Sequence, residues 1–508
     1  MTEIYTRFPP EPNGFIHIGH LKAMMSDFNK HENCRCILRF DDTNPDKENW
    51  DFVNGIKEDV EWLGFNPYKT TFTSDYFHIL YEYAIKMIEN GLAYVDFSTI
   101  EKIKADRHNG TDSEYRNKSI DYHLEEFNKM KNGVYNDNEC ILRLKIDMNH
   151  SNHVMRDPMA YRIKKTPHYK TGTEWCIYPS YDFSHGIVDA LENITYSYCT
   201  TEFLIRRELY YWPIEQLNKL GANLKPAEVT EFGKLVVENN ILSKRNIIKL
   251  VNDKVMTGYD DPRLLTIRGL KRRGYTPTIL KNIVQFASMG RSDQTFSNSM
   301  IKFHLREELD KNAIRAFGVV KPILVEIENF SDSLQVCMHQ NHPKSKDSHE
   351  TILTKNIYIE SSDFREVDDP DFFRLAPGKI IRLKYGPFIQ YVSHSKDPDF
   401  IRIICKIVEP EKPKKIKGII HWVSADPSYS TKVKYVLYND ILINNVFNEN
   451  SKEEHIGYIE NYASHIKESM QLERVGYFKY DHIDAKNVDN SSNLLVFIRV
   501  VELNDCRI

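Results

Sequence analysis

The chain has 508 residues, of which 41% are hydrophobic and 28% charged, and this apolar content excludes a wholly disordered protein. At about 150 residues per domain, the length predicts roughly three to four domains. The 68 Lys and Arg against 72 Asp and Glu residues give a net charge of −4, so any nucleic-acid binding must depend on local patches.

Residues 6–28 predict a strand, a loop and a helix. Residues 6–8 read as a short strand, and the loop 9–14 contains three prolines and an Asn-Gly pair. From Ile16 to Phe28, apolar residues recur at helical spacing. In an open α/β sheet, such a loop lies at the carboxyl end of a strand, where ligands bind, and the helix N-terminus offers N–H groups to a phosphate.

Four residues around the start of this helix are candidate nucleotide-binding residues. His17 and His20 are three residues apart and therefore share one helical face. Gly14 and Gly19 remove side chains where a planar nucleotide could approach. A histidine pair on a helix is more often a surface or core feature, and it is the preceding loop that favours a functional role.

The second predicted strand, 34–40, ends in the sequence DDTNP at 41–45. A carboxylate such as Asp41 at the end of a strand can meet a cation in the crevice, although this pentapeptide alone is typical of a turn. A helix at 51–63 is expected to pack back against the strands and complete a βαβ unit.

Three blocks of sequence stand in a fixed order. Residues 7–20 read RFPPEPNGFIHIGH, residues 38–45 read LRFDDTNP, and residues 242–245 read LSKR. In order and spacing they resemble the signature of class I aminoacyl-tRNA synthetases, in the form typical of the glutamyl/glutaminyl subgroup. The resemblance covers nearly the whole chain, which argues against a chance match.

The resemblance implies a multidomain α/β + β fold with a Rossmann-type nucleotide-binding domain, an acceptor-stem insert, a helical subdomain and two C-terminal β-barrels. Short alternating runs after about residue 313 also read as strands. The expected parts are the first half of the catalytic domain at 1–93, the acceptor-end-binding insert at 94–174, the second half of the catalytic domain at 175–240, the lysine-loop and helical subdomain at 241–312, and the two anticodon-binding barrels at 313–508, with the proximal barrel at about 313–355 and 445–508 and the distal barrel at about 356–444.

A helix is expected to start at Asp260 and to open the helical region that extends to about residue 312. Asp260, Asp261 and Pro262 would place acids and a proline in a first helical turn. The basic cluster at 271–273 could then follow tRNA phosphates.

By resemblance, the chain attaches glutamine to its cognate tRNA in an ATP-dependent reaction. A glutaminyl-adenylate would form first, and the glutaminyl group would then pass to the 2′-hydroxyl of the terminal adenosine. The implied partners are ATP, Mg²⁺, L-glutamine and a tRNA bound at its acceptor end and its anticodon. The protein is expected to be a monomer, and no dedicated protein site for a metal is apparent.

The resemblance also assigns roles to individual residues. His17, His20 and Lys244 would stabilise phosphate charge during catalysis. The substrate-binding residues would be Arg7 for the carboxylate, Asp41 for the ammonium group, Tyr181 for the side-chain amide, and Cys199. The ATP-binding residues would be Pro10, Glu11, Asn13, Gly14, His17, Gly19, His20, Lys234, Leu235, Leu242, Ser243 and Lys244. The anticodon-binding residues would be Arg315, Arg374, Arg382, Lys384, Gln471 and Arg474.

Cys199 favours glutamine over glutamate as the amino acid. Glutamyl relatives carry Arg at this position, and a buried Arg that faces a neutral amide would leave a charge unpaired. Val229, however, stands where the family usually has Gln, and the sequence at 234–236 is KLV where the family has Arg-Leu-Asn. A glutamate–tRNA ligase of the β-barrel type therefore stays open as an alternative.

A second alternative is a non-catalytic, synthetase-like protein that binds tRNA. A degenerate site would be expected to lose some of the signature residues. The chain retains His17, His20, Asp41, Tyr181 and Lys244.

Cysteine usage and hydropathy bear on localisation. No run of about 18 apolar residues occurs, so no transmembrane helix is expected, and residues 1–7 lack the apolar run of a secretory signal. The eight cysteines are scattered, and the one close pair, Cys34 and Cys36, reads as two residues of a strand rather than a zinc site. Few scattered cysteines suit a reducing compartment, so a cytoplasmic protein is expected.

Overall fold

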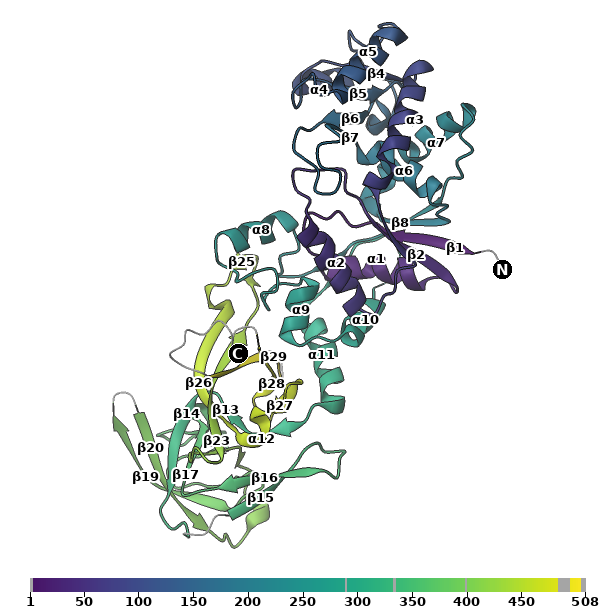
Figure 1. Ribbon diagram of the computed structural model, residues 1–508. Helices are drawn as coiled ribbons and strands as arrows, with labels where there is room; N and C mark the ends of the chain where they lie inside the picture. The colour runs from purple at the N-terminus through teal and green to yellow at the C-terminus, as the bar shows by residue number, and fades with distance from the viewer. Residues whose placement is uncertain (1–2, 288–289, 332–334, 398–399, 483–493, 504–508) are drawn as a thin grey trace. The chain divides into compact units, whose positions relative to one another are not determined.

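The computed structural model of the chain consists of two units (Figure 1). The first unit comprises Met1–Val236 and Val284–Thr295, and the second comprises Val237–Ile283 and Phe296–Ile508. The structure describes residues 3–287, 290–331, 335–397, 400–482 and 494–503.

Parallel strands form the centre of the first unit, as the predicted βαβ pattern requires. Strands β1 (Ile4–Phe8), β2 (Cys34–Phe40) and β3 (Lys69–Phe72) pair in parallel in the order β1-β2-β3. A second parallel pair joins β8 (Tyr196–Thr200) to β9 (Glu228–Phe232). The carboxyl ends of β1 and β2 lie at one edge of the sheet, where the two motif loops begin.

The β8–β9 pair lies beside β1. The Thr195 N–H donates to the Tyr5 carbonyl at 2.8 Å, and the Tyr5 N–H donates to the Thr195 hydroxyl at 3.1 Å. These bonds join the start of β8 to β1, so residues nearly 200 positions apart in sequence share one sheet edge.

Helices α1 (Ile18–Asn29) and α2 (Trp50–Trp62) follow β1 and β2, close to the predicted 16–28 and 51–63. α1 begins at Ile18 because His17 has an extended backbone and caps the helix. α2 presents its buried apolar residues at helical spacing, namely Val53, Ile56 and Val60.

An antiparallel sheet with its own helices follows the first parallel strands. Its strands pair in the order β4-β5-β6-β7. The elements are β4 (Ala93–Asp96), α4 (Ile100–Asn109), α5 (Ile120–Lys131), β5 (Ile141–Leu144), β6 (Met159–Ile163) and β7 (Ile177–Pro179). Three more helices share one apolar core with this sheet, α3 (Phe77–Glu89), α6 (Tyr181–Leu191) and α7 (Arg207–Lys219).

The second unit begins with helices. They are α8 (Lys244–Asn252), α9 (Ile267–Arg273), α10 (Pro277–Gln285) and α11 (Asn298–Asn312). The last two residues of α10 belong to the first unit. Helix α11 ends where the predicted helical region ends, at residue 312.

The prediction that a helix starts at Asp260 is wrong. The segment before α9 forms turns, and Thr266 caps α9 by accepting from the Gly269 N–H. The Asp261 carboxylate instead binds the guanidinium and the N–H of Arg263. This local ion pair takes up the carboxylate that the sequence pattern assigned to a first helical turn.

Two seven-stranded sheets make up most of the rest of the second unit, as the alternating runs predicted. The first has the order β12-β27-β28-β29-β23-β26-β13 and the second the order β21-β18-β19-β20-β14-β17-β22. The strands of the first sheet are β12 (Arg315–Ala316), β13 (Gly318–Val319), β23 (Ser430–Tyr438), β26 (Lys452–Glu460), β27 (Met470–Leu472), β28 (Gly476–Tyr480) and β29 (Leu495–Glu502). The strands of the second are β14 (Pro322–Ile327), β17 (Asn356–Glu360), β18 (Ile380–Leu383), β19 (Phe388–Asp397), β20 (Phe400–Val408), β21 (Ile419–Ile420) and β22 (Val423–Ser424).

The chain changes from one sheet to the other between β13 and β14 and again between β22 and β23. These positions differ from the barrel boundaries suggested at 355 and 444. Three short two-stranded sheets complete the fold, and one of them is a hairpin of β15 (Gln335–Gln340) and β16 (Ser348–Leu353). The other two pair β10 (Leu235–Val237) with β11 (Gln294–Phe296) and β24 (Leu442–Ile443) with β25 (Val446–Phe447).

Every helix within the described ranges is too short or too polar to cross a bilayer.

Candidate functional site

The start of α1 is held in shape by its own two histidines. The His17 ring accepts from the Gly19 N–H at 3.1 Å through Nδ1, and Nδ1 of His20 accepts from the His17 N–H at 3.1 Å. Their ring centroids lie 4.0 Å apart. Because each neutral ring accepts through Nδ1, each carries its proton on Nε2 as a donor. This arrangement suits phosphate oxygens at a helix N-terminus.

Gly19 leaves the helix start without a side chain that would crowd it. A Cβ atom at this position would lie 2.9 Å from Cε1 of the His17 ring and 3.7 Å from the Leu235 carbonyl oxygen. The first of these contacts is too close for a real Cβ atom, so the capping histidine requires glycine here. The predicted ATP-binding residue Leu235 therefore lies close to Gly19.

The loop before α1 lies against the end of β2. The Asp41 N–H donates to the Pro10 carbonyl at 3.1 Å. Within the loop, the Asn13 amide donates to the Glu11 carboxylate, and Gly14 is buried. The two strand ends that the sequence singled out are thus joined through the backbone.

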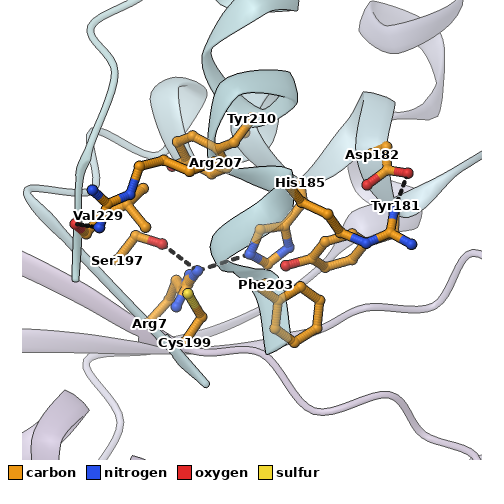
Figure 2. A pocket seen from close by; sticks show the side chains of 12 residues that line it. Arg7, Tyr181, Asp182, His185, Ser197, Cys199, Phe203, Arg207, Tyr210 and Val229 are labelled. Carbon is orange, nitrogen blue, oxygen red and sulfur yellow. Dashed lines mark hydrogen bonds and ion pairs between the residues drawn. The ribbon is translucent and has the colours of Figure 1, made fainter. Parts of the chain in front are cut away.

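A pocket is lined by residues of β1, α6, β8, α7 and β9 and by Phe203 and Arg206 between β8 and α7 (Figure 2). Three of the four predicted substrate-binding residues line it, Arg7, Tyr181 and Cys199. The fourth, Asp41, lies next to the pocket residue His185, with 3.8 Å between Oδ2 and Nδ1. The structure therefore brings all four residues together from four separate segments of the chain.

Arg7 is buried, with 1% of its surface exposed, and its guanidinium contacts several polar groups. Its Nε donates to Asp189 at 3.1 Å, Nη1 donates to the Tyr198 carbonyl at 3.1 Å, and Nη2 donates to the Ser197 hydroxyl at 2.6 Å. Nη2 also lies 2.8 Å from Nε2 of His185. These contacts, two of which are drawn in Figure 2, fix the guanidinium plane at the pocket.

Asp189 neutralises two buried arginines. Arg7 and Arg39 both donate to its Oδ1, and the Tyr210 hydroxyl donates to its Oδ2 at 2.8 Å. Burial by itself would raise the pKa of Asp189, but the charges of Arg7 and Arg39 overcome it and hold that pKa well below the ordinary value. The carboxylate is therefore ionised.

One face of α6 supplies Tyr181, His185 and Asp189, which are spaced four residues apart. The Tyr181 ring stacks on His185 with 4.5 Å between centroids. Burial raises the pKa of the Tyr181 hydroxyl, which therefore stays a neutral donor and acceptor. Burial lowers the pKa of His185, so that ring is neutral as well.

Strands β8 and β9 add a side of the pocket that carries no charge. Burial raises the pKa of the Cys199 thiol to about 11, so the thiol stays protonated. Val229, the register partner of Ser197 on the neighbouring strand, also lines the pocket and has no polar side-chain group. The departure from the family pattern at Val229 therefore falls within the pocket itself.

Each arginine that lines the pocket has a carboxylate partner. The pairs are Arg7 with Asp189, Arg206 with Asp182, and Arg207 with Glu231. The arginines therefore present the pocket with charges that are already compensated.

The remaining predicted ATP-binding residues fall in both units. In the first unit, Lys234 pairs with Glu202 at 2.6 Å. In the second unit, Ser243 directly precedes α8 and Lys244 begins it, with Leu242 just before them. The predicted roles of these three residues of the second unit stay predictions.

Two of the six predicted anticodon-binding residues meet at one carboxylate of the second unit. Arg474 donates to Asp363 through both Nη atoms at 2.7 Å, and Arg374 Nε lies 3.3 Å from the same carboxylate. Arg474 has a positive φ of 66°, in the left-handed region, which turns the chain directly after β27.

The other four predicted anticodon-binding residues lie on or beside strands of the two large sheets. Lys384 forms an ion pair with Glu473 just after β18, and Arg315 on β12 is the register partner of Gln471 on β27. Arg382 on β18 is exposed and faces the Phe388 ring, 5.6 Å from its centroid. An exposed guanidinium beside an aromatic ring suits contact with an unstacked base.

Several pocket residues were not assigned a role from the sequence. They include His185, Ser197, Phe203, Arg206 and Arg207. Asp189, which binds the pocket residue Arg7, was not assigned a role either. The spacing of Tyr181, His185 and Asp189 was a readable signal, because four-residue steps place side chains on one helical face. The other contacts depend on strand pairing between distant segments, which the sequence does not display.

Models of three domain families match the chain in succession. Residues 3–311 match "tRNA synthetases class I (E and Q), catalytic domain". Residues 313–408 and residues 419–481 match two models, each described as "tRNA synthetases class I (E and Q), anti-codon binding domain". The matched segments follow the order that the three sequence blocks and the alternating strands predicted.

Curated relatives align with almost the whole chain. A glutamine–tRNA ligase of Pseudoalteromonas atlantica is 39% identical over 99% of this chain and 94% of its own length, and one of Vibrio cholerae gives the same values. A cytoplasmic glutamine–tRNA ligase of Arabidopsis thaliana is 40% identical, and the chain spans 65% of that protein's length. Among solved structures, a glutamate–tRNA synthetase of Elizabethkingia anophelis matches at 20% identity with a TM-score of 0.44, over 61% of this chain and 72% of that chain. By the catalytic-domain match and the identity to these ligases, the chain belongs to the class I tRNA synthetases of the E and Q type, in the glutamine–tRNA ligase family.

Proposed function

We propose that this protein attaches glutamine to its cognate tRNA in an ATP-dependent reaction that passes through a glutaminyl-adenylate. The observation that carries the proposal is the charge balance of the pocket beside β1 and α6. Its three arginines are each paired with a carboxylate, and the Cys199 thiol and Tyr181 hydroxyl are neutral.

A pocket of this kind suits a neutral carboxamide better than a carboxylate. A glutamate side chain would bring a negative charge into a site whose arginines already bind Asp189, Asp182 and Glu231. That added charge would be desolvated without a free cation to compensate it. A glutamine side chain can exchange hydrogen bonds with the Tyr181 hydroxyl, which both donates and accepts.

ATP would bind at the start of α1. The Nε2–H groups of His17 and His20 would donate to phosphate oxygens as charge develops, and the absence of a side chain at Gly19 leaves room for close approach. These features fit a nucleotide. Lys244 would add a positive charge on the departing phosphates.

Magnesium would accompany the nucleotide and offset the triphosphate charge. In the described part of the chain, no group of three metal-ligating side chains lies beside the start of α1. Asp41, next to His185, would bind the ammonium group of glutamine. The predicted role of Arg7 toward the carboxylate stays a prediction, since its guanidinium already binds Asp189, Ser197 and the Tyr198 carbonyl.

For tRNA, we assign the acceptor end to the segment 94–174 and the anticodon to residues 313–508. The second assignment is supported by the two anticodon-binding family matches and by Arg382 at an exposed position on β18. The protein is proposed to work as a monomer.

Val229 is the pocket residue that favours glutamate charging instead, beside the departure from the family pattern at 234–236. It gives the pocket an apolar surface where an amide would help select glutamine. We expect the charge pairing of the three arginines to favour glutamine more strongly than the missing amide at position 229 disfavours it.

Charging of unfractionated tRNA with labelled glutamine, and in parallel with labelled glutamate, tests the proposal. Charging with glutamine alone is expected. Charging with glutamate alone would replace the proposal with a glutamate–tRNA ligase. Tight tRNA binding without charging by either amino acid would show a non-catalytic protein.

A further inference from the structure

Two histidines and a glutamate form a buried cluster in the second unit that has no part in the proposed reaction. His339 of β15, His349 of β16 and Glu460 at the end of β26 each offer one ligand atom, and these atoms lie within 4.8 Å of one another. His339 and His349 are register partners across the hairpin, so strand pairing sets them side by side. All three side chains are buried.

In each histidine ring, the nitrogen that points away from Glu460, called here the outer nitrogen, lies beside a hydrogen-bond acceptor. Nε2 of His339 lies 3.0 Å from the Glu473 carboxylate, and Nδ1 of His349 lies 2.6 Å from the Asn341 side-chain oxygen. A carboxylate and an amide oxygen can only accept, so each outer nitrogen must carry the proton. In a neutral ring, the inner nitrogen then has a lone pair and no proton.

Both inner nitrogens face the same carboxylate. Nδ1 of His339 lies 3.6 Å from Oε1 of Glu460, and Nε2 of His349 lies 3.1 Å from that oxygen. The Phe317 N–H also donates to this oxygen, at 2.6 Å. With both inner nitrogens unprotonated, the two nitrogens and the carboxylate form a site for a cation.

Two atoms of the cluster support this reading. Among the described residues, neither Nδ1 of His339 nor Oε2 of Glu460 has a hydrogen-bond partner, although both are fully shielded from solvent. His339 is 0% exposed and Glu460 is 4% exposed. Buried polar atoms without partners are costly, and a bound ion would satisfy both.

We propose that His339, His349 and Glu460 form a structural zinc site, with Glu473 and Asn341 orienting the two rings. Zinc prefers tetrahedral sites with imidazole and carboxylate ligands at about 2.0–2.1 Å, which puts neighbouring ligand atoms about 3.3 Å apart. The observed nitrogen–oxygen separations of 3.1 and 3.6 Å bracket that value. A carboxylate on the outer nitrogen of a ligating histidine is the usual second contact in zinc sites.

The site would tie three segments of the second unit together. Zinc would join the β15–β16 hairpin to the end of β26, and Glu473 would link the metal site to Lys384 through their ion pair. Glu473 also lies next to Arg474 and follows β27, which contains Gln471. The metal would thus brace a region that holds three predicted anticodon-binding residues.

Zinc binding to the full chain, first stripped of metal with a chelator, tests the proposal. Zinc chloride is titrated in buffer without ATP, in competition with a chromophoric chelator, and one tight equivalent per chain is expected. X-ray absorption at the zinc edge should show two imidazole ligands and oxygen, without sulfur.

Variants of the ligands locate the site. His349→Gln and Glu460→Gln are each expected to weaken zinc binding by more than about tenfold, because second contacts alone are worth about 10–100-fold. His455→Gln is the matched control, because His455 lies on β26, is partly exposed and pairs with Glu453 outside the cluster. It should bind zinc like the unaltered chain.

Three results would overturn the proposal. They are absence of a tight equivalent in the unaltered chain, sulfur ligands in its absorption spectrum, and unchanged binding in both ligand variants. If the ligand variants fail to fold, the spectrum of the unaltered chain decides alone, because the cluster contains no cysteine.

Discussion

Asp189 is the residue on which the charge balance of the pocket depends. It is fully buried and binds two fully buried arginines, one on β1 and one on β2. An arginine of this kind is tolerated only with a partner, since an unpaired buried charge is far more costly than the pair. The carboxylate therefore contributes both to folding and to the position of Arg7 in the pocket.

Replacing Asp189 with Asn should destabilise the protein by about 3–5 kcal/mol, because Arg7 would lose its carboxylate partner and Arg39 would keep only Glu192. Urea denaturation of Asp189→Asn and of the unaltered chain measures the difference. Asp182→Asn is the control, because Asp182 pairs with the more exposed Arg206 and should cost less than about 1 kcal/mol.

The Asp189 contribution also has a predicted pH dependence. The folded state lowers the pKa of this carboxyl, so its stabilisation is complete above the unfolded value of about 3.9 and is lost as pH falls below it. The difference between the Asn variant and the unaltered chain should be constant from pH 8 to pH 5 and shrink in stronger acid. A difference that instead grew in acid would contradict the assignment.

Cys199→Arg tests the neutral character of the pocket. A fourth arginine there would lack a carboxylate partner among the residues that pair with the other three. A buried unpaired charge costs about 3 kcal/mol, which would lower kcat/KM for glutamine about 100-fold. The value of kcat/KM for glutamate should fall less, because its carboxylate can pair with the new arginine. tRNA-dependent ATP–pyrophosphate exchange with each amino acid measures this, and Cys199→Ser should stay near the unaltered values.

The pocket shows how far single residues could be read from the sequence. The motifs predicted Arg7, Tyr181, Asp41 and Cys199, and the structure brings them together, although their roles stay predictions. Asp189 was not found, because it meets Arg7 across 182 positions of sequence. A contact of that range depends on how β1 packs against α6, which local patterns do not encode.

Helices and strands were predicted more fully than contacts. The helix at 18–29 and the strand at 34–40 follow directly from apolar spacing and from the prolines between them. The supposed helix start at Asp260 failed because Asp261 binds Arg263, a local alternative that competes with capping. The fold class is confirmed by the catalytic-domain and anticodon-domain matches and by the two seven-stranded sheets.

The loop between β2 and α2 carries buried acids that should make stability depend on pH. Burial raises the pKa of Asp42 to about 7, and burial together with the Asp42 charge raises the pKa of Glu48 to about 9. The Tyr169 hydroxyl and the His168 ring cover this loop, binding the carboxylate and the carbonyl of Asp42 at 3.0 Å. The folded state therefore binds protons that the unfolded chain releases at lower pH.

Glu48→Gln should remove part of this dependence. Because the pKa of Glu48 is raised in the folded state, this carboxyl makes the unaltered protein less stable as pH rises from about 4.5 to about 9. The loss for this one carboxyl is no more than about 1.4 kcal/mol per pH unit. The variant should match the unaltered chain at pH 5 and become the more stable of the two toward pH 9. Urea midpoints at a series of pH values measure this, and the exposed Glu61→Gln of α2 serves as control.

At the level of the whole chain, net charge offers no help in finding an RNA-binding surface. The total is −4, and most basic residues of the pocket and of the anticodon-binding set are paired with acids. Arg382 differs, since it is exposed on β18 and faces the Phe388 ring. Recognition of a base is therefore expected to depend on a few such residues rather than on a broad positive face.

Arg382→Ala should lower kcat/KM for tRNA charging by about 10–100-fold, because loss of one base contact costs about 1–3 kcal/mol. At saturating tRNA, KM for ATP should not change, since β18 holds none of the predicted ATP-binding residues. Arg402→Ala is the matched control, because Arg402 is an exposed arginine of the same sheet and pairs with Glu326. If Arg382 reads a base, its loss should also reduce discrimination between transcripts with native and altered anticodons. Equal effects of the two arginine variants on that discrimination would remove Arg382 from the recognition surface.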